Sequence, residues 1–329
     1  MRPELIDWRT GIPFLDRLVL PSYFTMLALA FAVGFILTRR HARATGQNVE
    51  RMTDLAVYVV IFSIIGARLA HVLFDGMLAD YVHVCLAPHR VSAVGLEHVT
   101  CITDEQCRIG ALQYVCDLAS GHCHPGRDCL AVFRAWQGGL TYYGGLILAF
   151  AFAYTYVKRH RLKWGPIMDL YGFLLPLGLT FGRMGCFLNG CCFGRPTTMP
   201  WAARFPAGSL ASWEQFGNGQ LASRNLPSLP AHPTQIYSAL ANLAIFFIVY
   251  LLVRPNKRYH GQMFVVFLTL YAVARFLIEF LRADQRGGLG LLSTSQIISL
   301  GMLVLAAVIH YFMESHHVSK AGRLPSARA

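Results

Sequence analysis

Long apolar runs alternate with short polar and basic segments along most of this 329-residue chain. A helix needs roughly 20 residues to cross a hydrocarbon core of about 30 Å, and seven of the runs are long enough to do so. With bounds good to a few residues, they are Pro21–Thr38, Asp54–Phe74, Gly138–Val157, Pro166–Phe187, Thr234–Val253, Gln262–Leu281 and Ser293–Phe312. The pattern predicts an all-α integral membrane protein with seven transmembrane helices.

Composition supports lipid as the main solvent of this chain. Hydrophobic residues make up 55% of it and charged residues only 14%, whereas a soluble domain carries roughly 25% charged residues. The formal net charge of +12 would suit nucleic acid, but the basic residues stand in short clusters between the apolar runs. Such clusters orient a membrane protein and contact anionic headgroups. We therefore expect membrane lipid as a partner, and no nucleic acid.

The basic clusters also predict the orientation of the chain. They follow the first, third, fifth and seventh runs, at Arg39, Arg40, Arg43, Arg51, Lys158, Arg159, Arg161, Lys163, Arg254, Lys257, Arg258, Lys320, Arg323 and Arg328. These positions fall on one side of the membrane, which the positive-inside rule makes cytoplasmic. The N-terminus is then outside, and residues 314–329 form a basic cytoplasmic tail.

Six cysteines are concentrated in the extracytoplasmic segment 75–136, between the second and third runs. They are Cys85, Cys101, Cys107, Cys116, Cys123 and Cys129. This density is typical of a small disulfide-stabilised module and leaves the pairing open. A metal site is the alternative, because His122 and His124 flank one cysteine, but paired C-x₂₋₄-C ligands are missing. We expect disulfides and no metal.

The other three cysteines stand near the outer end of the fourth run, in GRMGCFLNGCCFGRP. Cys186, Cys191 and Cys192 could serve as metal ligands or as a redox pair. Cysteine is also a small apolar residue that packs well, so packing or a structural disulfide is the favoured interpretation over active thiol chemistry.

Charged residues occur inside the predicted spans. Arg275, Glu279 and Arg282 share one face of the sixth helix, since positions i, i+4 and i+7 align, and Tyr271 lies one turn earlier. A guanidinium near the bilayer centre costs at least about 2.5 kcal/mol, so such a residue is by default a functional candidate. An internal Arg275–Glu279 salt bridge that only fixes helix packing is the alternative.

Two further arginines, Arg68 and Arg183, lie toward the outer ends of the second and fourth spans. Snorkelling of the head to the interface is a sufficient explanation for Arg282 and is possible for Arg68. Arginine forks match phosphate and carboxylate geometry, so converging arginines suit an anionic substrate. In a cavity open to lipid, that substrate would be a phospholipid headgroup.

Glycines are dense in the same places. Gly138-Gly139 and Gly144-Gly145 bracket Leu-Thr-Tyr-Tyr at the start of the third span, and four glycines stand in GRMGCFLNGCCFG. Glycine lets backbone approach a ligand closely and leaves N–H groups available to an anion. Close packing of helices through small residues explains the same pattern.

Several motifs, taken together, resemble the prolipoprotein diacylglyceryl transferases, seven-span enzymes of the bacterial inner membrane. In chain order the similar segments are GARLAHVLF, GGLTYYGGL, GRMGCFLNGCCFGRP, HPTQIYSAL, RFLIEFLRADQ and LSTSQIISLGM. The resemblance as a whole runs in order from about residue 21 to 312 and leaves out the cysteine-rich segment. The order of six short motifs on successive spans is far more specific than any one of them.

The resemblance implies an activity. Members of this family transfer a diacylglyceryl group from phosphatidylglycerol to the lipobox cysteine of a prolipoprotein signal peptide, and the resemblance implies no cofactor and no metal. Arg183 and Arg275 would hold the lipid phosphate and stabilise the leaving group, with Tyr143 as a further catalytic candidate. The positions that would bind or shape the substrate site are Tyr23, Arg68, Gly144, Gly145, Asn189, Gly194, His232, Gln235, Tyr271, Glu279 and Arg282.

The chain departs from the family pattern around the acceptor side. Tyr143 stands where the family has the histidine proposed as base, Cys186 where it has an asparagine, and Cys191 and Ser238 where it has glutamates. Tyrosine has an ordinary pKa near 10 and is a poor base at neutral pH. Two alternatives follow: a family paralogue that uses the same lipid donor with another acceptor, and a non-catalytic lipid-binding protein.

The predicted organisation has four parts. Residues 1–74 hold an N-terminal segment and two spans, and residues 75–136 form the cysteine-rich insert. Residues 137–313 form the catalytic membrane core, with a periplasmic head at about 188–232, and residues 314–329 form the tail.

Overall fold

The computed structural model describes residues 4–6, 20–91, 101–109, 112–118, 120–134, 139–223, 225–283, 288–289 and 292–321. Gly138 and the tail from residue 322, which carry parts of the predictions above, lie outside these ranges. The chain forms two compact units: Met1–Val49 with Lys163–Ala329, and Glu50–Leu162. Each unit is described by itself.

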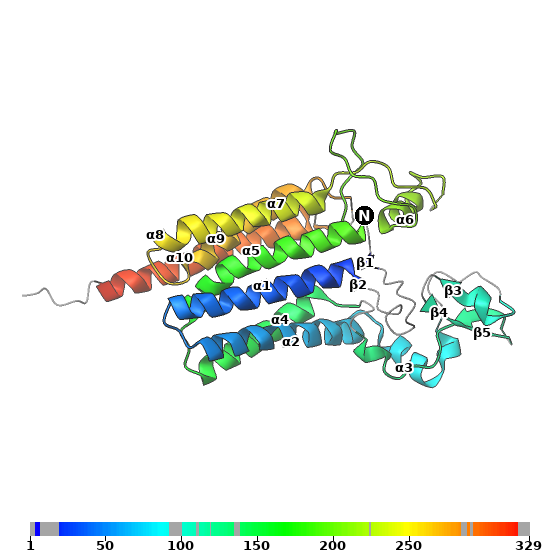
Figure 1. Ribbon diagram of the computed structural model, residues 1–329, viewed down its shortest axis with the longest axis horizontal. Helices are drawn as coiled ribbons and strands as arrows, with labels where there is room; N and C mark the ends of the chain where they lie inside the picture. Colours follow the sequence, from blue (N-terminus) through cyan, green and yellow to red (C-terminus); the bar gives the residue numbers. More distant parts are fainter. Residues whose placement is uncertain are drawn as a thin grey trace, which may run out of the picture. The chain divides into compact units, whose positions relative to one another are not determined.

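The larger unit is a helical bundle organised around one central helix (Figure 1). Its helices are α1 (Ser22–Ala44), α5 (Trp164–Asn189), α6 (Leu210–Gly217), α7 (Thr234–Phe247), α8 (Arg254–Asn256), α9 (Gln262–Glu279) and α10 (Thr294–Ala321). Helix α5, green in Figure 1, lies between α1 and α7 and also contacts α9, which in turn packs against α10. A π-helical stretch, Ile248–Val253, joins α7 to α8.

Two short antiparallel hairpins accompany the bundle. They are formed by β1 (Glu4–Ile6) with β2 (Leu20–Pro21) and by β7 (Gly288–Leu289) with β8 (Leu292–Ser293). The second hairpin joins α9 to α10, so it sets the position at which α10 begins beside α9.

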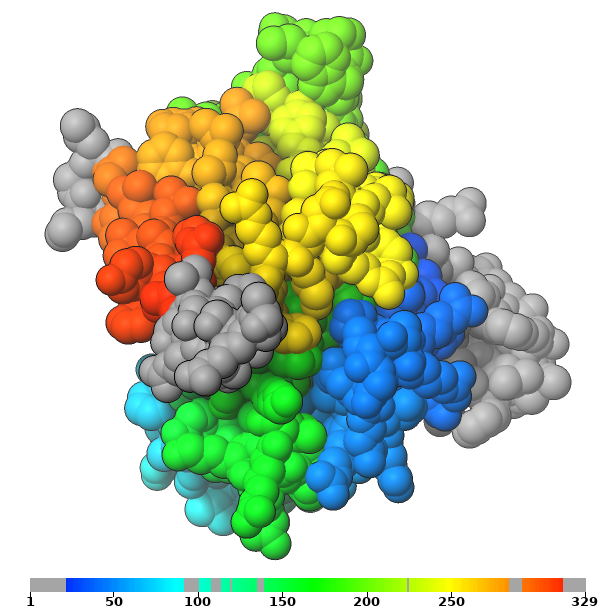
Figure 2. Space-filling view, turned by 90° about the vertical axis from the view of Figure 1, so that its left-hand side faces the viewer, coloured from blue at the N-terminus to red at the C-terminus, as the bar shows by residue number. Residues whose placement is uncertain are grey.

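A buried aspartate anchors the end of the bundle that carries α8. Figure 2 shows this end, with the segment that holds α8 in yellow. Asp169 on α5 is fully buried and accepts a hydrogen bond from Lys257 Nζ at 2.7 Å. Its other oxygen accepts the backbone N–H groups of Gly261, at 2.9 Å, and Met263. Gly261 has φ of +98°, which an L-residue rarely adopts, and it starts α9 at this point. Asp169 therefore fixes the turn between α8 and α9.

Six helices of the described part are long and apolar enough to cross a membrane. They are Ser22–Ala44, Val49–Phe74, Trp164–Asn189, Thr234–Asn256, Gln262–Glu279 and Thr294–Ser315. These six match six of the predicted spans and confirm a helical, multi-pass membrane protein. The third predicted span forms helix α4 (Tyr142–Arg159), but this helix starts with two tyrosines and ends with Lys158 and Arg159, and it is not among the six.

The smaller unit contains the insert between two helices. Its elements are α2 (Val49–Phe74), α3 (Leu78–Leu86), β3 (Arg108–Ile109), β4 (Leu112–Gln113), β5 (Val115–Asp117), β6 (His122–His124) and α4, with 3₁₀ turns at Pro88–Arg90, Asp104–Cys107 and Ala131–Phe133. Strands β3 and β4 form one hairpin, and β5 and β6 form another.

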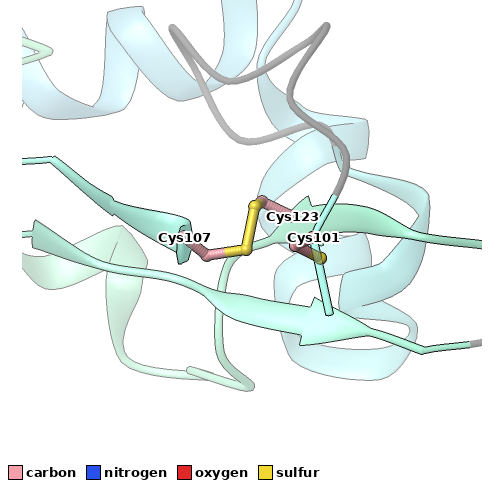
Figure 3. A group of neighbouring side chains, drawn as sticks. All are labelled: Cys101, Cys107 and Cys123. Carbon is pink, nitrogen blue, oxygen red and sulfur yellow. A yellow bond between two sulfur atoms is a disulfide. The ribbon is translucent and has the colours of Figure 1, made fainter. Parts of the chain in front are cut away.

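Disulfides form the core of this insert, as the sequence predicted. The pairs are Cys85–Cys129, Cys101–Cys116 and Cys107–Cys123. The last four cysteines are all buried and pack together with Tyr114, and Figure 3 shows Cys101 beside the Cys107–Cys123 bond. A segment this short cannot bury enough apolar surface to be stable, so disulfides supply the stability instead.

Helices α2 and α4 approach each other through glycines. A Cβ placed on Gly144 would lie 2.2 Å from the Cβ of Ala70 and 2.4 Å from the carbonyl oxygen of Gly66. A Cβ on Gly145, which is buried, would lie 2.8 Å from the carbonyl oxygen of Ser63. Small residues are what allow helices in a membrane to come this close.

Candidate functional site

The centre of the candidate site is a charged network on α9 and the start of α10. Arg275 Nη2 lies 2.8 Å from Glu279 Oε2 and donates a hydrogen bond to Ser295 Oγ at 2.8 Å. The second carboxylate oxygen of Glu279 accepts from Ser293 Oγ at 3.0 Å. Both charged side chains are nearly buried, with 12% and 7% of their surfaces exposed. The salt bridge that was weighed as an alternative for Arg275 is therefore present.

The contacts of Arg275 with Glu279 and Ser295 are both made by Nη2 of its guanidinium. Nη1 of Arg275 is buried, and no hydrogen-bond partner is found for it among the residues that the structure describes. A buried charged donor without a partner is costly, so its retention points to a ligand at this atom. The salt bridge and a ligand-binding role are thus compatible.

Arg282 extends the network toward the loop after α5. Its Nε lies 3.9 Å from Glu279 Oε2, and its side chain is only 2% exposed. The backbone of Arg282 forms an antiparallel bridge with that of Gly194. The next residue, Arg195, donates a hydrogen bond from Nε to the carbonyl oxygen of Arg282 at 3.1 Å. Arg282 therefore lies inside the protein, and snorkelling to an interface does not describe it.

Gly194 is required by space. A Cβ at this position would lie 2.6 Å from the Leu281 carbonyl oxygen and 2.7 Å from the Cβ of His232. Its N–H donates to the carbonyl oxygen of His232 at 2.9 Å, and the His232 N–H donates to Arg195 at 3.0 Å. The Nδ1 of His232 lies 3.3 Å from the hydroxyl of Tyr237. His232 and Gly194 thus hold three chain segments together beside the arginines.

A pocket brings the two main arginine candidates onto one surface. Its lining residues are Arg183, Ser238, Ala241, Asn242, Tyr271, Ala274, Arg275 and Ile278, from α5, α7 and α9. Asn242 donates from Nδ2 to the Ser238 carbonyl oxygen at 2.7 Å, while its Oδ1 is buried without a partner among the described residues. The pocket therefore offers guanidinium, hydroxyl and amide groups together.

The loop after α5 is tied to the start of α7. Gln235, which is buried, donates from Nε2 to the carbonyl oxygen of Cys191 at 2.7 Å. Thr234 donates from Oγ1 to the carbonyl oxygen of Cys192 at 2.8 Å. Gln235 was predicted to contact substrate, and its observed partner is backbone, which indicates that it positions the loop.

The three remaining cysteines gather in this loop. Cys186, Cys191 and Cys192 are free thiols with their sulfur atoms within 4.8 Å of one another, so the structural disulfide expected as one possibility is not formed. The pKa of the Cys192 thiol lies well below its usual range, because thiol hydrogen bonds from Cys186 and Cys191 stabilise the thiolate. The charges of Arg282 and Arg183 act in the same direction.

Two predicted residues lie at the margin of this region. Tyr23 on α1 packs against Gly185, where an added Cβ would lie 3.1 Å from its ring. Asn189, the last residue of α5, is exposed and lines a separate hollow with Gly190 and residues 206–210. Both are near the loop but do not line the arginine pocket.

Arg68 belongs to the smaller unit and has a structural environment there. Its guanidinium donates to the backbone carbonyl oxygens of Val132 at 2.6 Å, Ala131 at 2.7 Å and Gly139 at 3.1 Å. It also lies 5.0 Å from the ring centre of Tyr81. These contacts indicate that Arg68 fixes the end of the insert to α2.

Tyr143, Gly144 and Gly145 also lie in the smaller unit, in the first turn of α4. Tyr143 is 53% exposed, and its ring makes an edge contact with Tyr142. The two glycines face α2, as described above, which supports the helix-packing interpretation of this glycine pair.

The pocket and the charged network beside it include residues that the sequence motifs did not indicate. Asn242 stands one turn after Ser238 on α7, and a polar pair at this spacing inside an apolar run could have been noticed. Ser293 and Ser295 hold Glu279 and Arg275, but nothing in their local sequence indicates those partners.

The fold and the pocket together define a polytopic helical membrane protein with a buried cationic site. A sequence profile of the prolipoprotein diacylglyceryl transferases matches residues 13–96 and 108–312. The chain belongs to the prolipoprotein diacylglyceryl transferase family, as the motifs predicted.

Named relatives agree with the profile. A protein of Burkholderia thailandensis is 31% identical over 307 residues, which cover 87% of each chain. One of Bordetella bronchiseptica is 29% identical over 297 residues, covering 88% of this chain and 89% of its own. One of Stenotrophomonas maltophilia is 26% identical over 297 residues, covering 87% and 85%. All three bear the name phosphatidylglycerol–prolipoprotein diacylglyceryl transferase.

Proposed function

We propose that this chain transfers a diacylglyceryl group from phosphatidylglycerol to the cysteine thiol of a prolipoprotein lipobox, the first step of bacterial lipoprotein maturation. Membership of the family and the names of the relatives support this activity. The observation that carries it is the pocket shared by Arg183 and Arg275, with Nη1 of Arg275 buried and without a partner in the described chain.

The pocket suits a phosphate group. Two guanidinium groups can bind phosphate oxygens through charge-assisted hydrogen bonds, and Tyr271 adds a hydroxyl. We assign the pocket to the phosphate of the headgroup, with the acyl chains remaining in the bilayer.

The reaction needs two events at this phosphate. The cysteine sulfur forms a bond to the glyceryl carbon, and the bond from that carbon to the phosphate oxygen breaks. The electron pair leaves with that oxygen, and glycerol phosphate departs. Arg183 and Arg275 would stabilise the negative charge that grows there, which is electrostatic catalysis. Glu279 pairs with Arg275 and lies near Arg282, so we assign Glu279 and Arg282 to positioning.

The thiol must lose its proton to become a nucleophile, because its ordinary pKa is near 8.5. We propose Tyr143 as a further catalytic residue, because it stands in the family motif GGLTYYGGL. The remaining residues that we assign to substrate are Tyr23, Arg68, Gly144, Gly145, Asn189, Gly194, His232, Gln235 and Tyr271. Their contacts described above support positioning of backbone for Gly194, His232, Gln235 and Arg68.

We also propose that α4 is a seventh span and that the protein lies in the bacterial inner membrane with its N-terminus outside. Basic residues at the ends of α1, α4 and α8 support this orientation. Three disulfides between α2 and α4 support an oxidising location for the insert.

The test is transfer by purified full-length protein in vesicles that contain phosphatidylglycerol, with a synthetic lipobox peptide as acceptor. Mass spectrometry of the peptide measures thioether formation. We expect transfer by the parent protein, and a loss of roughly 10²–10³-fold with Arg183→Ala, because one charge-stabilising donor is removed. Arg254→Ala is the matched control, since Arg254 lies over the ring of Tyr250 at the start of α8, beyond the end of α7 and outside the residues that line the pocket.

Equal loss in both variants would contradict the phosphate assignment. Consumption of phosphatidylglycerol without a modified peptide would favour another acceptor, and binding of lipid without turnover would favour the non-catalytic alternative.

A further inference from the structure

Three free thiols meet where α5 ends, and the proposed transfer does not use them. Cys186 lies in the last turn of α5, and Cys191 and Cys192 follow in the loop. Their three sulfur atoms lie within 4.8 Å of one another, and all three residues are half-buried. The other six cysteines of the chain are held in disulfides, so these are its remaining thiols.

The backbone brings the thiols together and holds them. Gly190 ends α5 with φ of +74°, and the Cys191 N–H turns back to the carbonyl oxygen of Cys186 at 3.1 Å. Side chains of Thr234 and Gln235 on α7 fix the carbonyl oxygens of the two loop cysteines. Cys192 itself has φ of +62°, an uncommon conformation for a residue with a side chain. The cluster is therefore preorganised rather than left to a mobile loop.

We propose that Cys186, Cys191 and Cys192 form a binding site for one thiophilic metal ion with a filled d shell, such as Cu(I) or Zn(II), held by three thiolates. A metal–sulfur bond of about 2.3 Å places three sulfur ligands roughly 4 Å from one another. The observed limit of 4.8 Å needs only a small contraction to reach this spacing. Soft thiolate ligands select these ions over Mg²⁺ or Ca²⁺.

The surrounding charge favours such a complex. Three thiolates carry a net negative charge with either ion, and an uncompensated charge in a half-buried place is costly. The positive charges of Arg183 and Arg282 act on the Cys192 sulfur. No other histidine, cysteine or carboxylate of the described residues joins the group. That donor set suits trigonal Cu(I), or Zn(II) with water in its fourth position.

A disulfide within the cluster is the competing state. Adjacent residues have Cα atoms about 3.8 Å apart, below the roughly 4.4–6.8 Å usual for a disulfide, so a Cys191–Cys192 bond would need distortion. A bond from Cys186 to Cys191 or to Cys192 would remove the metal site.

The test uses purified full-length protein in detergent, kept anaerobic and incubated separately with Cu(I) and Zn(II). Bound metal after desalting is measured by elemental mass spectrometry, and competition with a chelator of known affinity gives the Kd. We expect about one ion per chain, and a loss of affinity of roughly tenfold or more, about 1.4 kcal/mol, for each single Cys→Ser variant. The two arms show which ion the site prefers.

The triple variant Cys186→Ser, Cys191→Ser, Cys192→Ser is the matched control, since serine keeps the size of cysteine but lacks the thiolate. Its gel-filtration profile and intact insert disulfides establish folding. Failure of both ions to bind the parent protein would overturn the proposal, as would undiminished binding by the triple variant. Thiol counting on the denatured, unreduced parent protein provides a further check: three thiols support the site, and one thiol contradicts it. None of these outcomes depends on transferase activity.

Discussion

The arginine pocket and the cysteine-rich insert are stabilised in opposite ways. In the pocket, Arg275 and Glu279 are held by each other and by two serine hydroxyls, all through non-covalent contacts. In the insert, two adjacent disulfides form the buried core. The family profile matches the chain on both sides of residues 97–107 in the insert and leaves that stretch out.

The difference follows from what each region must do. A site that binds phosphate needs charges, and buried charges are stable only when their partners remain in place. A small module with little apolar surface to bury is stabilised by cross-links, which restrict the unfolded chain. Removing one member of the buried ion pair should therefore also destabilise the charged partner that remains. Removing a disulfide should lower the stability of the insert alone.

The largest stability effect is expected for Glu279→Gln. This change leaves Arg275 and Arg282 buried without their shared carboxylate, and breaking a buried pair typically costs about 3–5 kcal/mol. Thermal unfolding in detergent measures the loss, and peptide transfer should fall with it because Arg275 loses its position.

Glu314→Gln is the matched control for that variant. Glu314 pairs with His310 on α10, but its side chain is 46% exposed, and such pairs contribute roughly 0–1 kcal/mol. If both variants unfold at the same temperature, the buried pair is not a major support of the bundle.

A smaller and local effect is expected from removal of the Cys101–Cys116 disulfide with Cys101→Ser and Cys116→Ser. A 15-residue separation corresponds to about 3 kcal/mol of stabilisation in the chain-entropy account. Limited proteolysis should cut the insert much faster, while peptide transfer should stay within about twofold of the parent protein, since the pocket residues all belong to the other unit. A loss of transfer comparable with that of Arg183→Ala would show that the insert takes part in the reaction.

The smallest effect concerns pH and the base of the insert. Hydrogen bonds from Thr141 and then His71 hold the pKa of Asp75 below its usual value of 3.8. A carboxyl group whose pKa is lowered by folding stabilises the folded state above its ordinary pKa, and this contribution is lost as the pH falls through the lowered pKa. The protection factor of amides at the start of α4, which corrects for the pH dependence of intrinsic exchange, should therefore fall as the pH drops from 5 to 2, on the order of a few-fold.

Asp75→Asn keeps the size of the side chain but cannot titrate, so it separates this carboxyl from others. We expect its exchange near Thr141 to lack the acid-dependent step attributed to Asp75. The same step in parent and variant would assign the change to another group.

Much of the architecture could be predicted because apolar runs and cysteine density are local signals. Six of the predicted spans coincide with helices that are long and apolar enough to cross a membrane. The third run was harder, because Tyr142, Tyr143, Lys158 and Arg159 lie inside α4 and reduce its apolar character. Helix ends were also placed only approximately: α1 continues to Ala44, beyond the predicted Thr38, since basic residues remain helical after the apolar run ends.

The site could be predicted only in part. Arg275, Glu279 and Arg282 were found because a 3.6-residue period places them on one face of a single helix, which needs no tertiary information. Ser293 and Ser295 were not predicted, because their partners lie on another element, α9. Asn242 was not predicted either, although Ser238 stands one turn before it on the same helix. Arg68 and Gln235 remain predicted substrate contacts, and the hydrogen bonds that the structure gives them go to backbone carbonyl oxygens.

The sequence by itself determined a polytopic membrane protein, an oxidised insert and a family, since each rests on residue type and spacing along the chain. Tertiary structure alone decided which cysteines pair, which polar groups hold Arg275, and that three thiols meet at the end of α5. The physical reason is distance. Spacing fixes neighbours within one helix, whereas a disulfide, a buried ion pair or a metal site depends on where the packing of separate segments places their atoms within a few ångströms.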